Sequence, residues 1–263
     1  MHKQSGTVQT TYALTVLIGL VLSLILTGVS YNFSPIRVVE NWLMDIRLVF
    51  LSSPDEPHPD VLILSINEDT LAGLQYRHPV DRAFLAHTLQ VLDQAQARVI
   101  GLDVLLDQAT EMEKDEALKG QLSKMRTPWF AAYATEADGL TPQQAAYIEA
   151  IIPTVHRATV NLARDSYDGV VRSSAGNLVE RLHPAGLTPE VLYLGLNSKL
   201  LGFWDGAVKK YPLHQIEKLP KAWLKDKIIL IGADLSLTDR YPSSWTALLG
   251  QSAGSMPGVE FHA

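Results

Sequence analysis

The stretch VLILSI at residues 61–66 decides the fold of this chain. It is almost wholly aliphatic and does not alternate with polar residues, a pattern typical of a strand that is buried on both faces. Two similar runs follow, VIGLDVLL at residues 99–106 and KIILIG at residues 227–232. The sequence therefore predicts three buried strands.

A helix is predicted between the first two of these strands. Asp81 can cap it, and Phe84, Leu85, Leu89 and Leu92 then share one face. A strand, a helix and a second strand joined by about thirty residues indicate a parallel βαβ unit. The predicted fold class is α/β, with a mostly parallel central sheet flanked by helices.

The remaining elements are predicted from weaker patterns. Helices are expected at residues 115–124, from Thr141 to just before Pro153, and from Thr188 to Leu200; strands are expected at residues 129–134, and as a pair at 159–162 and 170–179 across an Asp168-Gly169 turn.

The N-terminal part of the chain carries an uncharged apolar run, YALTVLIGLVLSLILTGV at residues 12–29. It approaches the ~20 residues that span a bilayer, so we predict a cytoplasmic segment at 1–11 and one transmembrane helix at 12–31. A cleaved signal peptide is the alternative, with small residues at Gly28-Val29-Ser30. Lys3 precedes the run, which favours a cytoplasmic N-terminus and an extracytoplasmic head on the inner membrane. Arg37 and Arg47 weaken that asymmetry.

A juxtamembrane helix is predicted at residues 34–51, because Ser34-Pro35 is a typical helix start. Its apolar residues recur at spacings of three and four: Ile36, Val39, Leu43, Ile46 and Phe50. Two hypotheses explain this face. It packs on its own domain, or it forms a homodimer contact beside the membrane.

Composition excludes several classes of function. The chain of 263 residues has a net charge of −6 and no basic stripe, so nucleic acid is not expected as a partner. It has no cysteine, which excludes disulfides, thiolate metal sites and cysteine nucleophiles. Phosphate-binding loops and the usual hydrolase motifs are missing from the sequence, and its eight histidines are scattered singly. We predict no catalytic residues, no metal ligands and no cofactor.

Acidic residues follow each of the three predicted strands. Glu68 and Asp69 follow the first, Asp103 and Asp107 lie in and after the second, and Asp234 and Asp239 follow the third. In open α/β sheets, ligands bind beyond the carboxyl ends of the strands. If the strands are neighbours, these carboxylates converge in a site suited to a hard cation or a cationic ligand. The alternative is structural, with Asp69 and Asp81 as helix caps.

Two further predictions concern individual side chains. Asp103 stands in an apolar run, where an ionised carboxylate needs a partner, for which Arg172 is a candidate. Asp168 and Arg172 flank the hairpin turn, where they form an ion pair or contact a ligand. The candidate ligand-binding residues are Glu68, Asp69, Asp103, Asp168, Arg172, Asp234 and Asp239.

Several segments together resemble the CHASE2 family of extracytoplasmic sensor domains. The resemblance covers about residues 37–263, and its matching pieces are LMDIR at 43–47, VLILSINED at 61–69, ARVIGLDVL at 97–105, DGVVR at 168–172, KIILIGA at 227–233 with Asp239, and PGVEFHA at 257–263. One departure is the segment YRHPVDR at 76–82, which lacks the tryptophans usual before the first long helix.

The resemblance implies a sensor that responds to a small-molecule or environmental signal outside the cytoplasmic membrane. Such domains pass the signal through later membrane helices to a cytoplasmic output, typically a nucleotide cyclase or a protein kinase. Two other hypotheses stay open for this chain: a membrane-tethered, metal-dependent hydrolase that uses the strand-end acids, and a non-sensing dimerisation or anchor module.

Overall fold

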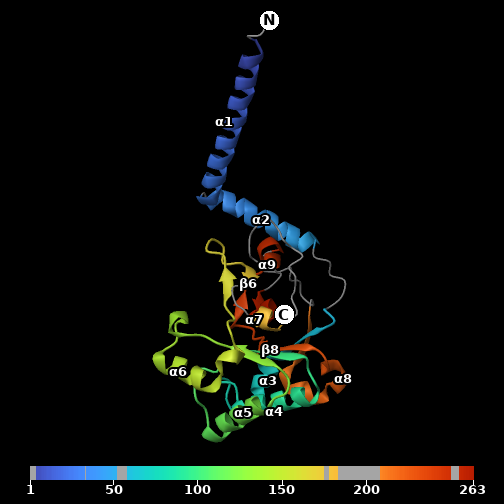
Figure 1. Cartoon of the computed structure of the whole chain (residues 1–263). Coiled ribbons are helices and arrows are strands. Elements are labelled where there is room, and N and C mark those ends of the chain that lie inside the picture. The colour runs from blue at the N-terminus through green and yellow to red at the C-terminus, as the bar shows by residue number, and fades with distance from the viewer. Residues whose placement is uncertain (1–3, 33, 52–57, 175–177, 183–207, 250–254) are drawn as a thin grey trace. The chain divides into compact units, whose positions relative to one another are not determined.

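A computed structural model describes residues 4–32, 34–51, 58–174, 178–182, 208–249 and 255–263 (Figure 1). The chain divides into two compact units, Met1–Arg47 and Leu48–Ala263. Each unit is described below by itself. The helix predicted from Thr188 to Leu200 lies outside the described residues.

The N-terminal unit is helical. Helix α1 spans Gln4–Asn32, and helix α2 spans Ser34–Leu51, as predicted for the juxtamembrane helix. Large apolar side chains of α1 are exposed, from Leu14 to Leu26. Counting only residues whose side chains are described, we find no helix that is both long and apolar enough to cross a membrane. The span predicted at residues 12–31 is therefore not confirmed.

The larger unit is built on a six-stranded sheet in which every pairing is parallel. Its strands, in the spatial order β4-β3-β2-β8-β1-β7, are Arg157–Ala158, Trp129–Ala132, Val99–Asp103, Ile228–Ala233, Val61–Ile66 and Lys209–Pro212. The three predicted apolar strands are neighbours at its centre, which confirms the α/β fold and the mostly parallel sheet. β2 ends at Asp103, three residues earlier than predicted.

Strand β7 was not predicted from the sequence. Its four residues, KKYP, include two lysines and a proline, and it lies at the edge of the sheet. Lysine and proline are typical of edge strands, because they discourage pairing with a further strand. The apolar pattern used to recognise central strands is therefore missing here.

Each face of the sheet packs against its own hydrophobic core. On one face, Leu64, Ile100 and Ile231 belong to the same core as residues of α4 (Arg82–Gln94) and α5 (Met112–Lys124). On the other face, Ile63 and Leu230 pack in a smaller core with α7 (Leu178–Leu182) and Val259. Figure 1 shows α3, α4 and α5 on one side of β8 and α7 on the other.

The remaining helices connect the strands. They are α3 (Glu68–Ala72), α6 (Pro142–Ile151), α8 (Lys221–Leu224) and α9 (Ser244–Leu249), with short 3-10 helices at Glu136–Asp138, Thr154–His156, Leu213–Lys218 and Gly258–His262 (η5). The Asp81 side chain accepts a 3.0 Å hydrogen bond from the Phe84 N–H, which confirms it as the α4 cap. Asn67, not Asp69, caps α3.

Two small antiparallel ladders complete the fold. β5 (Leu162–Arg164) pairs with β6 (Val171–Ser174) across the predicted Asp168-Gly169 turn, and Gly169 has the positive φ of 73° that this turn requires. β9 (Arg240–Tyr241) pairs with β10 (Met256–Pro257). The strand predicted at 170–179 is too long, since α7 begins at Leu178.

Candidate functional site

The carboxyl ends of β2 and β8 place Asp103 beside a glycine. Asp103, the last residue of β2, lies in register with Gly232 of β8. A Cβ atom added to Gly232 would come within 2.6 Å of the Val259 side chain and 3.2 Å of the Asp103 Cβ. Real Cβ atoms do not approach side chains so closely. Gly232 therefore allows the C-terminal helix η5 to lie directly on the strand next to Asp103.

Asp239 joins the same place from the loop that follows β8. Its backbone has a φ of 55°, an uncommon conformation for a residue other than glycine, and its carbonyl accepts a 2.9 Å hydrogen bond from the Gly258 N–H. A Cβ on Gly258 would lie 2.8 Å from both carboxylate oxygens of Asp239. Asp239 is thus packed tightly against the first residue of η5.

The two acids influence each other's ionisation. Burial, and then the negative charge of Asp239, raise the pKa of Asp103 to about 7. The residue as a whole is half-buried when judged by its solvent-accessible surface. Its carboxyl group, however, is enclosed by protein atoms, and this enclosure determines the pKa of Asp103. The pKa of Asp239 is raised as well, because protein atoms surround its carboxyl group although the residue is exposed by surface area. A hydrogen bond from Tyr241 and the charges of Arg164 and Arg240 oppose this shift.

The partner predicted for Asp103 is not found. Among the described residues Asp103 has no hydrogen-bond or ion-pair partner. Arg172 instead pairs with Asp168, with 2.7 Å between Nη2 and Oδ2, inside the β5–β6 hairpin. The prediction was wrong because an enclosed carboxyl whose pKa is near 7 can be held neutral rather than paired.

Asp234 and Glu68 lie at the same edge but are neutralised by cations. Asp234 accepts a 2.9 Å hydrogen bond from Arg240 Nη1 and lies 3.5 Å from Lys210 Nζ, which also contacts Glu260 of η5 at 2.5 Å. Glu68 pairs with Arg77 at 2.5 Å, and this hydrogen bond lowers the Glu68 pKa. Asp234 is therefore held in a partly buried network of ion pairs, whereas the pair of Glu68 with Arg77 is exposed.

The predicted set of seven residues is thus divided by the structure. Asp103 and Asp239 come together. Asp234 is connected to η5 by Lys210, which contacts both Asp234 and Glu260. Glu68 reaches that loop through a 3.4 Å hydrogen bond from Ser236. Asp69 is exposed in the first turn of α3. Asp168 and Arg172 belong to the hairpin.

His262 of η5 was not predicted from the sequence. It is buried, and its Nδ1 atom has no hydrogen-bond partner among the described residues. Burial lowers the His262 pKa to about 4, against a hydrogen bond with the Val160 backbone. A single histidine without metal-ligand spacing gave no signal in the sequence.

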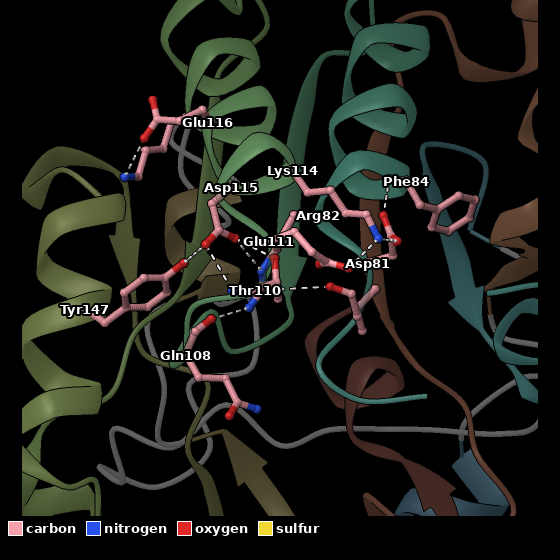
Figure 2. Close-up of polar contacts among 12 residues, drawn as sticks. Asp81, Arg82, Phe84, Gln108, Thr110, Glu111, Lys114, Asp115, Glu116 and Tyr147 are labelled. Carbon is pink, nitrogen blue, oxygen red and sulfur yellow. Dashed lines mark hydrogen bonds and ion pairs between the residues drawn. The ribbon is translucent and has the colours of Figure 1, made fainter. Parts of the chain in front are cut away.

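A second polar network surrounds Arg82 at the start of α4 (Figure 2). The Arg82 side chain is fully buried, and its Nη1 and Nη2 groups donate to the carbonyls of Val80 and Gln108 at 3.3 and 3.2 Å. Its Nε atom lies 4.0 Å from an Asp115 oxygen and has no hydrogen bond among the described residues. Arg82 therefore ties the loop after β2 to α4.

Asp115 extends this network from α5 to α6. It accepts hydrogen bonds from the Thr110 hydroxyl at 2.7 Å and the Tyr147 hydroxyl at 2.9 Å. Burial opposes its ionisation, but these hydrogen bonds keep the Asp115 pKa below its usual value. Burial and the Asp115 charge raise the pKa of Tyr147 to about 12.

A more exposed layer of the network holds the N-termini of α4 and α5 together. Lys114 Nζ contacts the Asp81 cap at 2.7 Å and Glu111 at 2.9 Å, and the Tyr76 hydroxyl donates to Glu111 at 2.7 Å. Figure 2 shows Lys114 and Arg82 reaching between the two helices. Sequence analysis marked residues 76–82 only as a departure from a family pattern, so the role of Arg82 was missed.

The chemistry open to the Asp103–Asp239 pair follows from its charge. Asp103 has no cationic partner among the described residues, although Arg164 and Arg240 act on Asp239. Such a pair of neighbouring acids holds a proton at neutral pH and releases it when a further positive group arrives. Among the described residues there is no group of three or more histidines or acids placed to hold a metal ion. The arrangement suits the binding of a proton or a small cation.

The family model of the CHASE2 domain matches residues 16–263 of this chain. No curated protein and no solved structure matches the chain significantly.

Proposed function

We propose that this chain, which belongs to the CHASE2 family of receptor sensor domains, detects its signal at the Asp103–Asp239 edge of the sheet and transmits it through η5. In this proposal the chain is the input part of a membrane-bound receptor. Its output would be a cytoplasmic domain such as a nucleotide cyclase or a protein kinase.

The observation that carries the proposal is the contact between the acid pair and η5. Asp239 is packed against Gly258, and Gly232 next to Asp103 receives Val259. Lys210 connects Asp234 to Glu260 of the same short helix. A change of charge at the acid pair therefore acts directly on residues 258–262, without any intermediate element.

A sensor must also have two states that its signal can distinguish. With a pKa of about 7, Asp103 is divided between protonated and ionised forms at neutral pH. Ionisation places two negative charges next to each other, which a proton or a cationic ligand relieves. A signal that binds one form more tightly shifts the population in proportion to that difference in affinity.

The membrane placement is a further part of the proposal. The exposed apolar side chains of α1 and the uncharged run at residues 12–29 support insertion of α1 as an anchor, with Lys3 favouring an extracytoplasmic head. A reporter that is active only in the cytoplasm, fused after Ala263, is expected to be silent. Strong activity of that reporter would contradict the orientation.

Self-association is proposed through the exposed face of α2. Ile36, Val39 and Leu43 have exposed fractions of 36%, 55% and 49% and repeat at helical spacing. Replacing Val39 and Leu43 by alanine is expected to reduce cross-linked dimer of the membrane-bound chain. An unchanged dimer yield after both substitutions would contradict this contact.

The test of the sensing role uses the full-length receptor and one matched pair of variants. Asp103→Asn mimics the protonated acid, whereas Asp69→Asn removes the same charge from an exposed position on the neighbouring α3. We expect Asp103→Asn to fix the output at one level, independent of external pH between about 5 and 8, and Asp69→Asn to leave the response as in the parent. Unchanged signalling by a folded Asp103→Asn receptor would exclude the acid pair as the sensing site.

A further inference from the structure

A cavity of about 400 Å³ lies beside the amino ends of β1 and β8, at the opposite end of these strands from Asp103. Its walls come from β1, the edge strand β7, α8 and the residue before β8. The volume falls in the range of roughly 300 to 1,000 Å³ that small-molecule sites occupy. The cavity is thus large enough for a ligand of one or two rings.

One wall of this cavity is aromatic. Trp223 of α8 and Tyr211 of β7 both line it, with ring centroids 5.7 Å apart and planes inclined by 37°. Trp223 is 49% exposed, although the indole is among the most costly side chains to leave in water. Val61 and Leu62 add apolar surface from β1. A flat apolar group can therefore stack on Trp223.

The charged side chains that line the cavity are both positive. Lys209 and Lys227 line it, and no acidic side chain does so within the part of the chain that the structure describes. Lys227 is held by the Pro59 carbonyl at 2.7 Å and by Asp60 at 3.6 Å, while Asp60 also lies 3.8 Å from Arg98. Lys209 is exposed and has no ion-pair partner among the described residues. Its ammonium group is therefore available to an anion.

The segment around α8 is rich in lysine. Residues 218–227, which contain α8, include four lysines and one acid, Asp226. This local excess stands in a chain whose net charge is −6. The exposed ammonium group of Lys209 beside an aromatic wall favours a ligand that is both flat and negatively charged.

We propose that this cavity binds a small planar aromatic carboxylate, with its ring stacked on Trp223 and its carboxylate paired with Lys209. The site is separate from the Asp103–Asp239 edge, and its ligand has the opposite charge to the one that edge would accept. It therefore adds a second input that does not depend on the proposed sensing role of Asp103.

The test uses a matched pair of probes in equilibrium dialysis against the full chain in detergent, with the same detergent on both sides. Indole-3-acetate carries the carboxylate, and tryptophol has the same ring with a neutral hydroxyl. We expect saturable binding of one indole-3-acetate per chain with a Kd of about 1 mM or tighter. Tryptophol should bind about tenfold more weakly, because it lacks the charge-assisted contact.

Three variants assign the binding to this cavity. Lys209→Gln should weaken indole-3-acetate about tenfold and leave tryptophol unchanged. Trp223→Leu should weaken both probes. Lys124→Gln, which removes an equal charge from an exposed position at the end of α5, should change neither.

Two results would overturn the proposal. One is the absence of saturable indole-3-acetate binding in the millimolar range by a folded chain. The other is binding that Lys209→Gln and Lys124→Gln weaken equally, which would indicate general charge attraction. Neither result bears on the signalling of Asp103→Asn receptors, so the two proposals fail separately.

Discussion

Asp103 lies in register with Gly232 at the carboxyl ends of the neighbouring strands β2 and β8. The Val259 side chain occupies the space that a side chain at position 232 would take. The Asp103 carboxyl group, the backbone of β8 at Gly232 and the C-terminal helix η5 therefore lie next to one another. Because interiors are close-packed, a change at any of the three is felt by the other two.

Gly232→Ala should destabilise the larger unit. The new methyl group would lie 2.6 Å from the Val259 Cβ and Cγ2 atoms, so η5 must shift. Overpacking of this kind costs about 1 to 3 kcal/mol. Chemical denaturation of the full chain measures the loss.

Gly120→Ala is the matched control for that experiment. Gly120 lies inside α5, and a Cβ there meets nothing within 4 Å. Alanine should therefore raise stability by about 0.5 to 1 kcal/mol through helix propensity. Equal effects of the two substitutions would contradict the packing described at Gly232.

Asp103→Asn should change the pH dependence of stability. The Asp103 pKa is raised from about 3.8 to about 7 on folding, so the folded chain binds more protons between these pH values. The contribution of Asp103 to the stability of the parent is therefore lost as pH rises from 4 to 7, and it amounts to at most about 4 kcal/mol. Asparagine does not ionise, so the stability of the variant relative to the parent should grow over this range.

His262 contributes with the opposite sign. Its pKa falls from 6.5 to about 4 on folding, so its contribution is complete above pH 6.5 and is lost as pH falls towards 4. In the parent, Asp103 offsets the pH dependence of stability that His262 causes, whereas in Asp103→Asn it no longer does so. Denaturation curves at pH 4.5, 5.5, 6.5 and 7.5 measure both effects, and a stability difference between variant and parent that stays constant with pH would contradict the assignment.

Arg82→Met should be far more destabilising than Arg77→Met. Arg82 is fully buried, and its loss leaves the carbonyls of Val80 and Gln108 without their hydrogen bonds from this side chain. The Asp115 carboxylate also loses its ion-pair partner. Removing one member of a buried charged network costs about 3 to 5 kcal/mol. Arg77 and Glu68 form an exposed ion pair, and losing it is expected to lower the free energy of unfolding by about 1 kcal/mol or less. Thermal unfolding compares them, and similar losses would contradict the role of Arg82.

The central strands were predictable because their sequences are continuous apolar runs, as burial on both faces of a sheet requires. β1 and β8 are almost wholly aliphatic and are buried on both faces of the sheet. Local chemistry also predicted the Asp81 cap and the Asp168-Gly169 turn. β7 gave no such signal, because an edge strand is selected against pairing rather than for burial.

The site was predictable only in part. Sequence placed acids at the strand ends, but the meeting of Asp103 with Asp239 depends on the φ of 55° at Asp239 and on the course of its loop. Arg82 was missed because two of its partners are backbone carbonyls. Every residue has a backbone carbonyl, so the amino-acid types in the sequence do not show which of them an arginine will contact. His262 was missed because its burial depends on η5 packing onto β8.

The most direct test of the central claim is hydrogen–deuterium exchange of residues 256–263 at pH 5.5 and pH 8, corrected for intrinsic rates. The account predicts that protection of these residues differs between the two pH values in the parent chain and is the same at both in Asp103→Asn. Protection that changes with pH equally in the parent and in Asp103→Asn would contradict coupling between Asp103 and η5.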